Sequence, residues 1–413
     1  MTINARKWVL FSALFVLSAT TARGAGYEFE GVGARQVSRG GAAIADADDW
    51  TAIYWNPANV AKKRSSDIGV EIFTGEAFGR DPNSMNKLVG SIFTKDELHS
   101  NFILGAVGAT LPIGERGGIG FGFYTPLLQG ADFNAVGTNA NRTVLDLENA
   151  AAILTWNLSG AYKFTERFSG GAGLNLLYGR LISDIEMSNY QFAGDRLANN
   201  VDGDGFGLEG MFGVRYEATE KISLGAVYRT GSDVDLEGDA SSDYTAPLPL
   251  VVNERSGFHY DLRHPPTWGV GVALRPSQRW TFTFDYNRTL WHRFVSNIRY
   301  NTPGTFLPNL PNSFDWQDTY KVRFGARRKL STKNELIAGY SYEEPALDSA
   351  SIDFSTAIDV YMNRLSFGYA HAWNERVETT LGIVAGYGER DINNQTYRLS
   401  GYQVMFETRF GTL

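Results

Sequence analysis

The chain has 413 residues, with 38 basic and 45 acidic side chains and a formal net charge of −7. Because binding to nucleic-acid phosphates requires a basic surplus, this balance excludes a general nucleic-acid-binding protein. The absence of cysteine excludes a disulfide scaffold, a thiolate zinc site and an iron–sulfur cluster, and we expect neither a cofactor nor a metal. Glycine contributes 45 residues and aromatic residues 13%, a combination typical of β structure.

The first residues have the features of a secretory signal. Arg6 and Lys7 form a short basic region, residues 8–19 are mainly apolar, and Ala22 and Gly24 supply the small residues that a signal peptidase reads. The apolar run is too short to cross a bilayer as a helix. We therefore expect residues 1–24 to be a signal peptide, with a buried helix as the alternative.

Most of the remaining chain alternates between apolar and polar residues. In residues 280–287, one face of the predicted strand carries Trp280, Phe282, Phe284 and Tyr286, and the other face is polar. The same pattern predicts about fourteen strands, if residues 256–276 form one long strand that bends at Pro265-Pro266.

The predicted strands are about ten residues long or more, as tilted strands that cross a bilayer must be, whereas soluble strands average about 5–6 residues. Short turns alternate with longer stretches. The turns include 165–167, 219–221, 276–278, 332–334 and 374–376, and the expected long loops include 133–148, 189–202, 239–253 and 300–314. We therefore predict an all-β fold, a transmembrane antiparallel β-barrel of about 14 strands over residues 65–413, with a large soluble β-sandwich as the alternative.

Residues 25–64 precede the first predicted strand and lack a clean alternation. They contain many small residues, an acidic turn at 46–49, and Asn56-Pro57, which signals a turn or a helix start. A barrel of this size encloses a lumen wide enough for a plug. We predict that residues 25–64 form an N-terminal hatch that plugs the lumen, with a disordered tail as the alternative.

The N-terminal segment contains residues 25–27, residues 41–46 and the motif Asn56-Pro57-Ala58. These resemble the hatch of the FadL/TodX family of outer-membrane transporters for long-chain fatty acids and hydrocarbons, and they are the most specific matches. Further similarity follows in chain order at 158–164, 175–178, 266–268, 320–325 and 339–345.

The resemblance implies a multi-pass barrel in the outer membrane of a Gram-negative cell that takes up hydrophobic compounds passively and releases them through an opening in its wall. Its expected partners are a hydrophobic small molecule, either a fatty acid or a hydrocarbon, and outer-membrane lipid. We expect a monomer with no nucleic-acid partner and no enzymatic activity.

Other functions remain open on the sequence. A general solute porin is the main alternative. An outer-membrane hydrolase rests only on His99-Ser100-Asn101, which a turn at the start of a strand explains as well. A structural barrel or an adhesin would have the same strand pattern.

Lys321, Arg323 and Arg327 are candidate ligand-binding residues. They share one parity on a strand whose other face is apolar, so we expect all three to point into the lumen. There they would bind the acidic head group of a cargo. The alternative is a structural role, in which lumen cations pair with Glu71, Asp285 or Glu407.

Two further sets of candidate residues lie in the N-terminal segment and in a predicted strand around Pro126. Tyr27 and Phe29 are candidates for an apolar lining of the lumen, although ordinary packing would explain them too. Pro126 lies within a strand pattern and cannot donate a ladder hydrogen bond, so it marks a kink or bulge. By resemblance this is the kinked third strand of the family, and we predict a lateral opening from Pro126 to Phe133, which includes Gly130 and Asp132. The alternative is that Pro126 ends the strand.

Overall fold

The computed structural model describes residues 30–62, 65–80, 97–136, 141–247, 250–309, 315–348, 359–392 and 394–411. The predicted signal peptide lies outside these residues. The helical elements are α2 Ala34–Val37, α3 Ala52–Trp55, η1 Pro57–Lys62 and η2 Trp291–Arg293. The strands are β1 Asp67–Arg80, β2 Glu97–Ile113, β3 Gly117–Val136, β4 Val144–Lys163, β5 Phe168–Ser188, β6 Arg196–Glu217, β7 Ile222–Thr245, β8 Val251–His264, β9 Thr267–Ser277, β10 Trp280–Thr289, β11 Val295–Tyr300, β12 Thr319–Lys329, β13 Asn334–Glu343, β14 Tyr361–Ala372, β15 Val377–Ile392 and β16 Gln395–Gly411.

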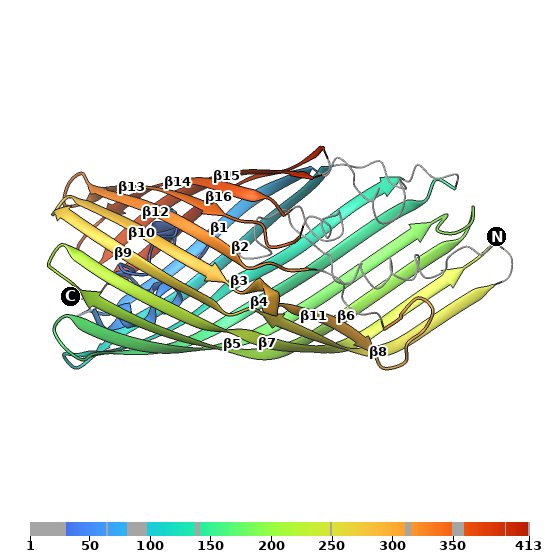
Figure 1. Cartoon of the computed structure of the whole chain (residues 1–413), viewed down its shortest axis with the longest axis horizontal. Coiled ribbons are helices and arrows are strands. Elements are labelled where there is room, and N and C mark those ends of the chain that lie inside the picture. Colours follow the sequence, from blue (N-terminus) through green and yellow to red (C-terminus); the bar gives the residue numbers. More distant parts are fainter. Residues whose placement is uncertain are drawn as a thin grey trace.

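The strands close into one antiparallel barrel (Figure 1). β1 pairs with both β2 and β16, and β9 pairs with both β7 and β10, so the paired strands close into a ring. β7 pairs with β8 and with β9, which are therefore two parts of one strand that bends at Pro265-Pro266. β10 pairs with β9 and β11 pairs with β8, so β10 and β11 also count as one strand. The sixteen labelled strands therefore make a barrel of 14 strands. The predicted fold class and the predicted bend are confirmed.

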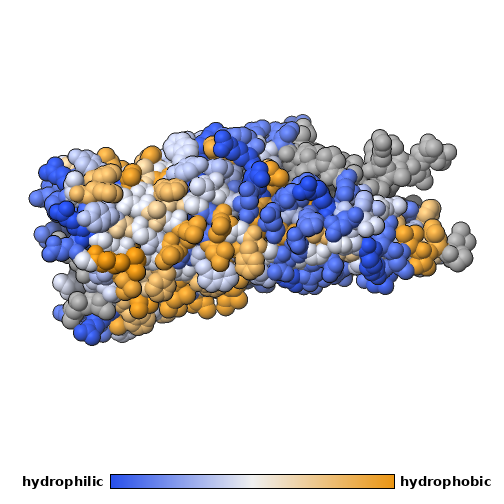
Figure 2. Space-filling model, turned by 90° about the horizontal axis from the view of Figure 1, so that it is seen from below, coloured by the Kyte–Doolittle hydropathy of each residue, from blue (hydrophilic) through white to orange (hydrophobic). Residues whose placement is uncertain are grey.

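The barrel has an apolar outer face near the rim with the short turns. Leu174 of β5 and Phe212 of β6 are exposed there, whereas Asn157 and Asn175 on the inward face are buried. Farther along the same strands the outward positions become charged, as in the exposed pair of Glu186 and Arg196. Figure 2 shows this change as an orange and pale zone followed by a blue zone. An apolar band of this kind is what a barrel presents to lipid.

Three of the four stretches expected as long loops, 133–148, 189–202 and 239–253, contain strand residues, whereas the described part of 300–314 has no strand beyond Tyr300. β7 and β8 remain paired as far as Thr245 and Val251, so most of 239–253 belongs to a hairpin. β3 likewise continues to Val136, and β6 begins at Arg196. For those three stretches the expected extent of the loops was wrong, because the expectation relied on apolar alternation. These strand ends extend beyond the apolar band, and their outward residues are polar there.

Residues 30–62, called here the inner segment, lie inside the barrel near the rim with the short turns (Figure 1, blue). Their side chains are almost all buried, including Trp50, Gln36 and Arg39. The segment contains only the short elements α2, α3 and η1. None of the described helices is long and apolar enough to cross a membrane.

Candidate functional site

Carboxylates of the barrel wall hold the inner segment through its backbone. All of them are inward-facing and buried, and each accepts N–H groups that no helix or sheet would otherwise satisfy. Glu71 accepts from Gly33 N at 2.8 Å, Glu407 from Arg35 N at 3.0 Å and Trp50 Nε1 at 2.7 Å, Asp285 from Ala43 N at 2.6 Å and Ile44 N at 2.8 Å, and Asp67 from Trp50 N at 2.6 Å. The alternative, structural interpretation paired Glu71, Asp285 and Glu407 with lumen cations; in the structure these three carboxylates accept hydrogen bonds from the inner segment.

The motif Asn56-Pro57-Ala58 joins the inner segment to β6. Asn56 Oδ1 accepts a hydrogen bond from Ala58 N at 3.0 Å, which closes a tight turn. Asn56 Nδ2 donates to the carbonyl of Ile44 at 2.9 Å and to that of Val214 at 3.1 Å. The wall residue opposite is Gly213, and a Cβ there would lie 2.0 Å from Asn56 Oδ1. Only glycine leaves space for this contact.

Glycines on the inward face allow the same close approach elsewhere. A Cβ on Gly171 of β5 would lie 2.6 Å from the carbonyl carbon of Pro57, and a Cβ on Gly69 of β1 would overlap the Trp50 ring. Glycines on the inward face of the wall thus leave the space that the inner segment needs to pack against the barrel.

Asp46 is the centre of a buried ion cluster that links the inner segment to β9 and β12. Its carboxylate lies 2.8 Å from Arg327 Nη2, 3.4 Å from Lys62 Nζ and 3.5 Å from Arg39 Nη1, and it also pairs with Arg275. Burial alone would raise the pKa of Asp46, but Lys62 and Arg327 outweigh burial and lower it. Asp46 is therefore a carboxylate at all ordinary pH values.

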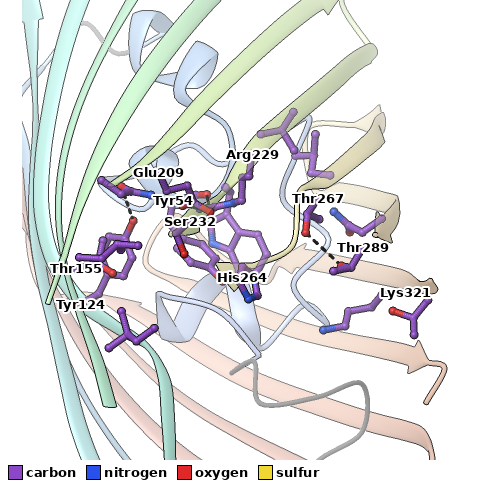
Figure 3. A pocket seen from close by; sticks show the side chains of 18 of the residues that line it. Tyr54, Tyr124, Thr155, Glu209, Arg229, Ser232, His264, Thr267, Thr289 and Lys321 are labelled. Atoms are coloured by element: carbon purple, nitrogen blue, oxygen red, sulfur yellow. Dashed lines mark hydrogen bonds and ion pairs between the residues drawn. The ribbon is translucent and has the colours of Figure 1, made fainter. Parts of the chain in front are cut away.

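A cavity of about 110 Å³ lies between the inner segment and the wall (Figure 3). Aromatic and aliphatic side chains form one part of its lining, and hydroxyl, amide and charged groups form the rest. The apolar lining is Ile44, Tyr54, Trp55, Tyr124, Ile153, Leu177 and Val227; the polar lining is Thr155, Asn175, Glu209, Arg229, Ser232, His264, Thr267, Asn287, Thr289, Thr319, Lys321, Arg323 and Glu343. A cavity with both kinds of surface suits an amphipathic or aromatic molecule.

A hydrogen-bonded network fixes one side of this cavity. Arg229 Nη1 pairs with Glu209 Oε2 at 3.0 Å, and Asn175 Nδ2 donates to the same oxygen at 2.6 Å. Tyr124 donates its hydroxyl to Asn175 Oδ1 at 3.3 Å. The Arg229 guanidinium also lies 4.8 Å from the centroid of the Tyr54 ring. The charge of Arg229 is thus balanced within the protein.

The three predicted cations have different surroundings. Lys321 pairs with Glu343, and Arg327 contacts Asp46 and Asp48 in the ion cluster. Arg323 lies over the Trp55 ring, 5.6 Å from its centroid, and donates to Asn287 Oδ1. No described carboxylate forms an ion pair with Arg323, and its buried Nε has no hydrogen-bond partner among the residues that the structure places. Lys321 and Arg323 line the cavity, and Arg327 does not.

The wall is irregular at the predicted opening. β3 and β4 shift register between Tyr124 and Leu127, and Pro126 lies in this irregularity. β2 and β3 pair only through residues 107–113 and 117–123, as far as the structure describes these strands. Gly130, Asp132 and Phe133 continue β3 and pair with β4. Tyr27 and Phe29 lie outside the described residues.

Sequence reasoning missed much of the cavity. Tyr54, Trp55 and Tyr124 come from segments that only the folded chain brings together. Arg229 could be placed in the lumen by its strand parity, but its partner Glu209 lies on a neighbouring strand. His264 had no signal beyond its position before the two prolines.

The amino-acid sequence of this chain is similar to those of known proteins. A sequence model of the family described as outer membrane protein transport protein (OMPP1/FadL/TodX) matches residues 13–396. The long-chain fatty acid transport protein of Escherichia coli K12 is 24% identical over 298 residues, which cover 62% of this chain and 65% of that protein. The protein of the same name from Salmonella typhi is 23% identical over 281 residues, which cover 62% and 64%. The chain thus matches somewhat less than two thirds of the length of these curated relatives.

Solved structures show the same fold. A FadL homologue from Pseudomonas aeruginosa superimposes with a TM-score of 0.76 at 13% identity, covering 94% of this chain and 99% of that one. The toluene transporter TodX of Pseudomonas putida gives 0.72 at 17% identity, covering 93% and 98%. The monoaromatic hydrocarbon channel CymD gives 0.69 at 17% identity, covering 94% and 99%.

Proposed function

This chain belongs to the outer membrane protein transport family OMPP1/FadL/TodX, and we propose that it carries hydrophobic compounds, either long-chain fatty acids or hydrocarbons, passively across the outer membrane. The observation that supports this most directly is the cavity between the inner segment and the wall, which Tyr54, Trp55 and Arg323 help to line. The proposal includes no catalytic step.

An apolar cargo needs a route that avoids water. A fourteen-carbon chain left in water costs ~0.8 kcal/mol per CH₂, roughly 11 kcal/mol in total. An open aqueous pore would impose that cost along its whole length. In our proposal the inner segment is the hatch expected for residues 25–64, and it fills the lumen with side chains in place of water.

Arg323 is the proposed contact for an acidic head group. Buried polar groups are normally hydrogen-bonded. Five arginines have a buried Nε without a partner among the described residues, and Arg323 differs from the other four in forming no ion pair with a described carboxylate. A fatty-acid carboxylate placed beside Arg323 would satisfy that nitrogen. Lys321 and Arg229 already have carboxylate partners, so a hydrocarbon would occupy the same cavity without involving any of the three.

Release is proposed to occur sideways through the wall. β2 and β3 separate above residues 107 and 123, next to the irregularity at Pro126. In our proposal this unpaired stretch gives the cargo a route from the lumen to the lipid without passage through water. In this proposal Pro126, Gly130, Asp132 and Phe133 border that route.

Two measurements on the purified protein test the proposal. Mass spectrometry of material extracted from the protein is expected to find a fatty acid or hydrocarbon, and planar bilayers are expected to show little ion conductance because the lumen is filled. Large, steady conductance with no hydrophobic molecule bound would identify a general porin and contradict the proposal. Uptake of labelled fatty acid and of toluene into vesicles then decides between the two cargo classes.

A further inference from the structure

The barrel wall has a second interruption, far from β3 in the sequence. The β7–β9 ladder ends at the pair of Arg229 and Thr267, and the β7–β8 ladder begins at the pair of Ser232 and His264. Between these pairs, residues 230–231 face residues 265–266 without register partners. Pro265 and Pro266 have no N–H to donate, so this part of the ladder cannot form.

The interruption is built into several strands at the same level. Gly231 has a φ of 76°, in the left-handed region that other residues rarely adopt. The β6–β7 ladder shifts register between Glu209 and Met211, and Gly210 N donates to Thr230 Oγ1 at 2.9 Å in place of a ladder bond. The helix η2 separates β10 from β11 beside the same bend. The strand pairing is therefore irregular at one level of the wall, in β6, in β7 and at the bend between β8 and β9, and η2 interrupts the next strand between β10 and β11.

Two hollows meet at this interruption. Ser232 and His264 line the inner cavity, where Figure 3 shows them from the lumen side. The same two residues line a groove on the outer face. That groove is formed by Leu176, Phe206, Gly207, Leu208, Thr230, Gly231, Ser232, Asp233, Arg263, His264, Pro266, His292, Arg293 and Val295. The inner cavity and the outer groove thus have Ser232 and His264, one register pair, in common as lining residues.

The outer groove lies where the surface changes from apolar to charged. Phe206 and Leu208 are each 58% exposed on its apolar side, while Asp233 and Arg263 form an exposed ion pair on the other. Because the short turns mark the periplasmic rim of such barrels, the charged side faces outward. The groove therefore lies at the boundary between the acyl chains and the head groups of the outer leaflet.

Cations mark both ends of this passage. On the outside, Arg263 pairs with Asp233 and His292 bonds to Asp318, whereas exposed Arg293 forms no ion pair with any residue that the structure describes. On the inside, Arg323 is buried, and it likewise forms no ion pair with a described residue. An amphipathic acid with its tail on Phe206 and Leu208 would have its carboxylate beside Arg293.

We propose that this interruption is an entrance through which amphipathic carboxylates pass from the outer leaflet into the lumen cavity. The two register partners Ser232 and His264 form its gate, and they must move apart for the head group to pass from Arg293 toward Arg323. The entrance rests on the proposed transport function and adds to it a route of access, distinct from the release route at β3.

A reversible cross-link tests the gate, and the absence of native cysteine makes it specific. Directly opposed residues of antiparallel strands have Cα atoms about 4.5–5.5 Å apart, within reach of a disulfide. In Ser232→Cys/His264→Cys we expect uptake of a long-chain fatty acid into vesicles to be lost on oxidation and restored by reductant. The control is Ala240→Cys/Ser256→Cys, a buried pair of the same parity on the same two strands. Equal uptake by the oxidised and reduced gate variant would overturn the entrance.

A second measurement uses the unmodified protein. A fatty acid that carries a diazirine in its chain, irradiated with the protein in vesicles, is expected to label peptides that contain Phe206 and Leu208. Labelling confined to β3 and to regions outside the groove would overturn the entrance while leaving transport intact. If the unmodified protein takes up neither fatty acid nor hydrocarbon, the proposed function itself fails, and the two failures are thus distinguishable.

Discussion

Asp46 accepts a hydrogen bond of 2.8 Å from Nη2 of Arg327, and this contact joins the inner segment to β12 of the barrel. Both side chains are buried. Arg275 of β9 reaches the same carboxylate, so one acidic residue connects the segment to two separate parts of the wall. Arg327 therefore has a carboxylate partner in the protein. Arg323 lies four residues earlier on the same face of β12 and forms no ion pair with a described residue.

Replacing Asp46 with asparagine is expected to loosen the inner segment. Asp46→Asn keeps the shape of the side chain but leaves Arg327 and Lys62 without this negative charge. Unpairing buried charges typically costs about 3–5 kcal/mol. We expect faster proteolysis within residues 30–62 and higher conductance in planar bilayers. The control is Asp204→Asn on the exposed outer face of β6, and equal behaviour of the two variants would contradict the assignment.

The same cluster predicts a loss of stability in acid. Burial would raise the pKa of Asp46, but Lys62 and Arg327 outweigh it, so the pKa is lower in the folded protein than in the unfolded chain. Such a group stabilises the fold above its unfolded pKa of about 3.9 and loses that contribution as the pH falls through the lowered folded value. Conductance should therefore rise only below about pH 4, and this rise should be smaller in Asp46→Asn. A rise confined to alkaline pH would refute this explanation.

The Asn56 contact depends on a glycine. A Cβ on Gly213 would lie 2.0 Å from Asn56 Oδ1, so Gly213→Ala must displace the motif from β6. Overpacking of this kind costs typically about 1–3 kcal/mol. Gly160→Ala is the matched control, because a Cβ there meets nothing within 4 Å. We expect a lower unfolding temperature in detergent for Gly213→Ala alone, and equal values for both variants would argue against the contact.

The barrel could be predicted because its two faces meet different solvents. Lipid on one side and the lumen on the other impose strict alternation, as in residues 280–287, which the structure places in β10. Proline chemistry likewise located the bend at Pro265-Pro266. The method failed where the strands leave the lipid, since the outward residues of 239–245 are as polar as those of a loop.

The interior could be predicted only in part. Parity placed Lys321, Arg323 and Arg327 on the inward face, but it gave no information on which carboxylate each would meet. Those partners lie on the inner segment and on neighbouring strands, as Asp46 and Glu343 do. Strand register and the path of the inner segment decide the pairing, and neither has a signal in a single sequence.

Arg323 is expected to distinguish the two cargo classes. Arg323→Gln keeps a polar side chain of similar reach but removes the cation beside the cavity. Truncating one partner of a buried, hydrogen-bonded charge pair typically costs about 2–5 kcal/mol of binding energy. We expect weaker binding of a long-chain fatty acid with unchanged binding of toluene, measured by calorimetry in detergent. Arg180→Gln, an exposed cation on β5, serves as the control, and intact fatty-acid binding by Arg323→Gln would remove this residue from the site.

The β3 irregularity is the last element to test. Pro126→Val supplies a missing N–H, and Gly130→Val adds a residue that favours regular strand, so the double variant should extend the β2–β3 ladder beyond Phe123. If cargo leaves through that gap, uptake into vesicles should fall while binding in detergent persists. Pro112→Val is the control, because Pro112 lies in the paired part of β2 opposite Gly118. Unchanged uptake by the double variant would show that release occurs elsewhere, and a fall in binding as well would indicate damage to the lumen cavity.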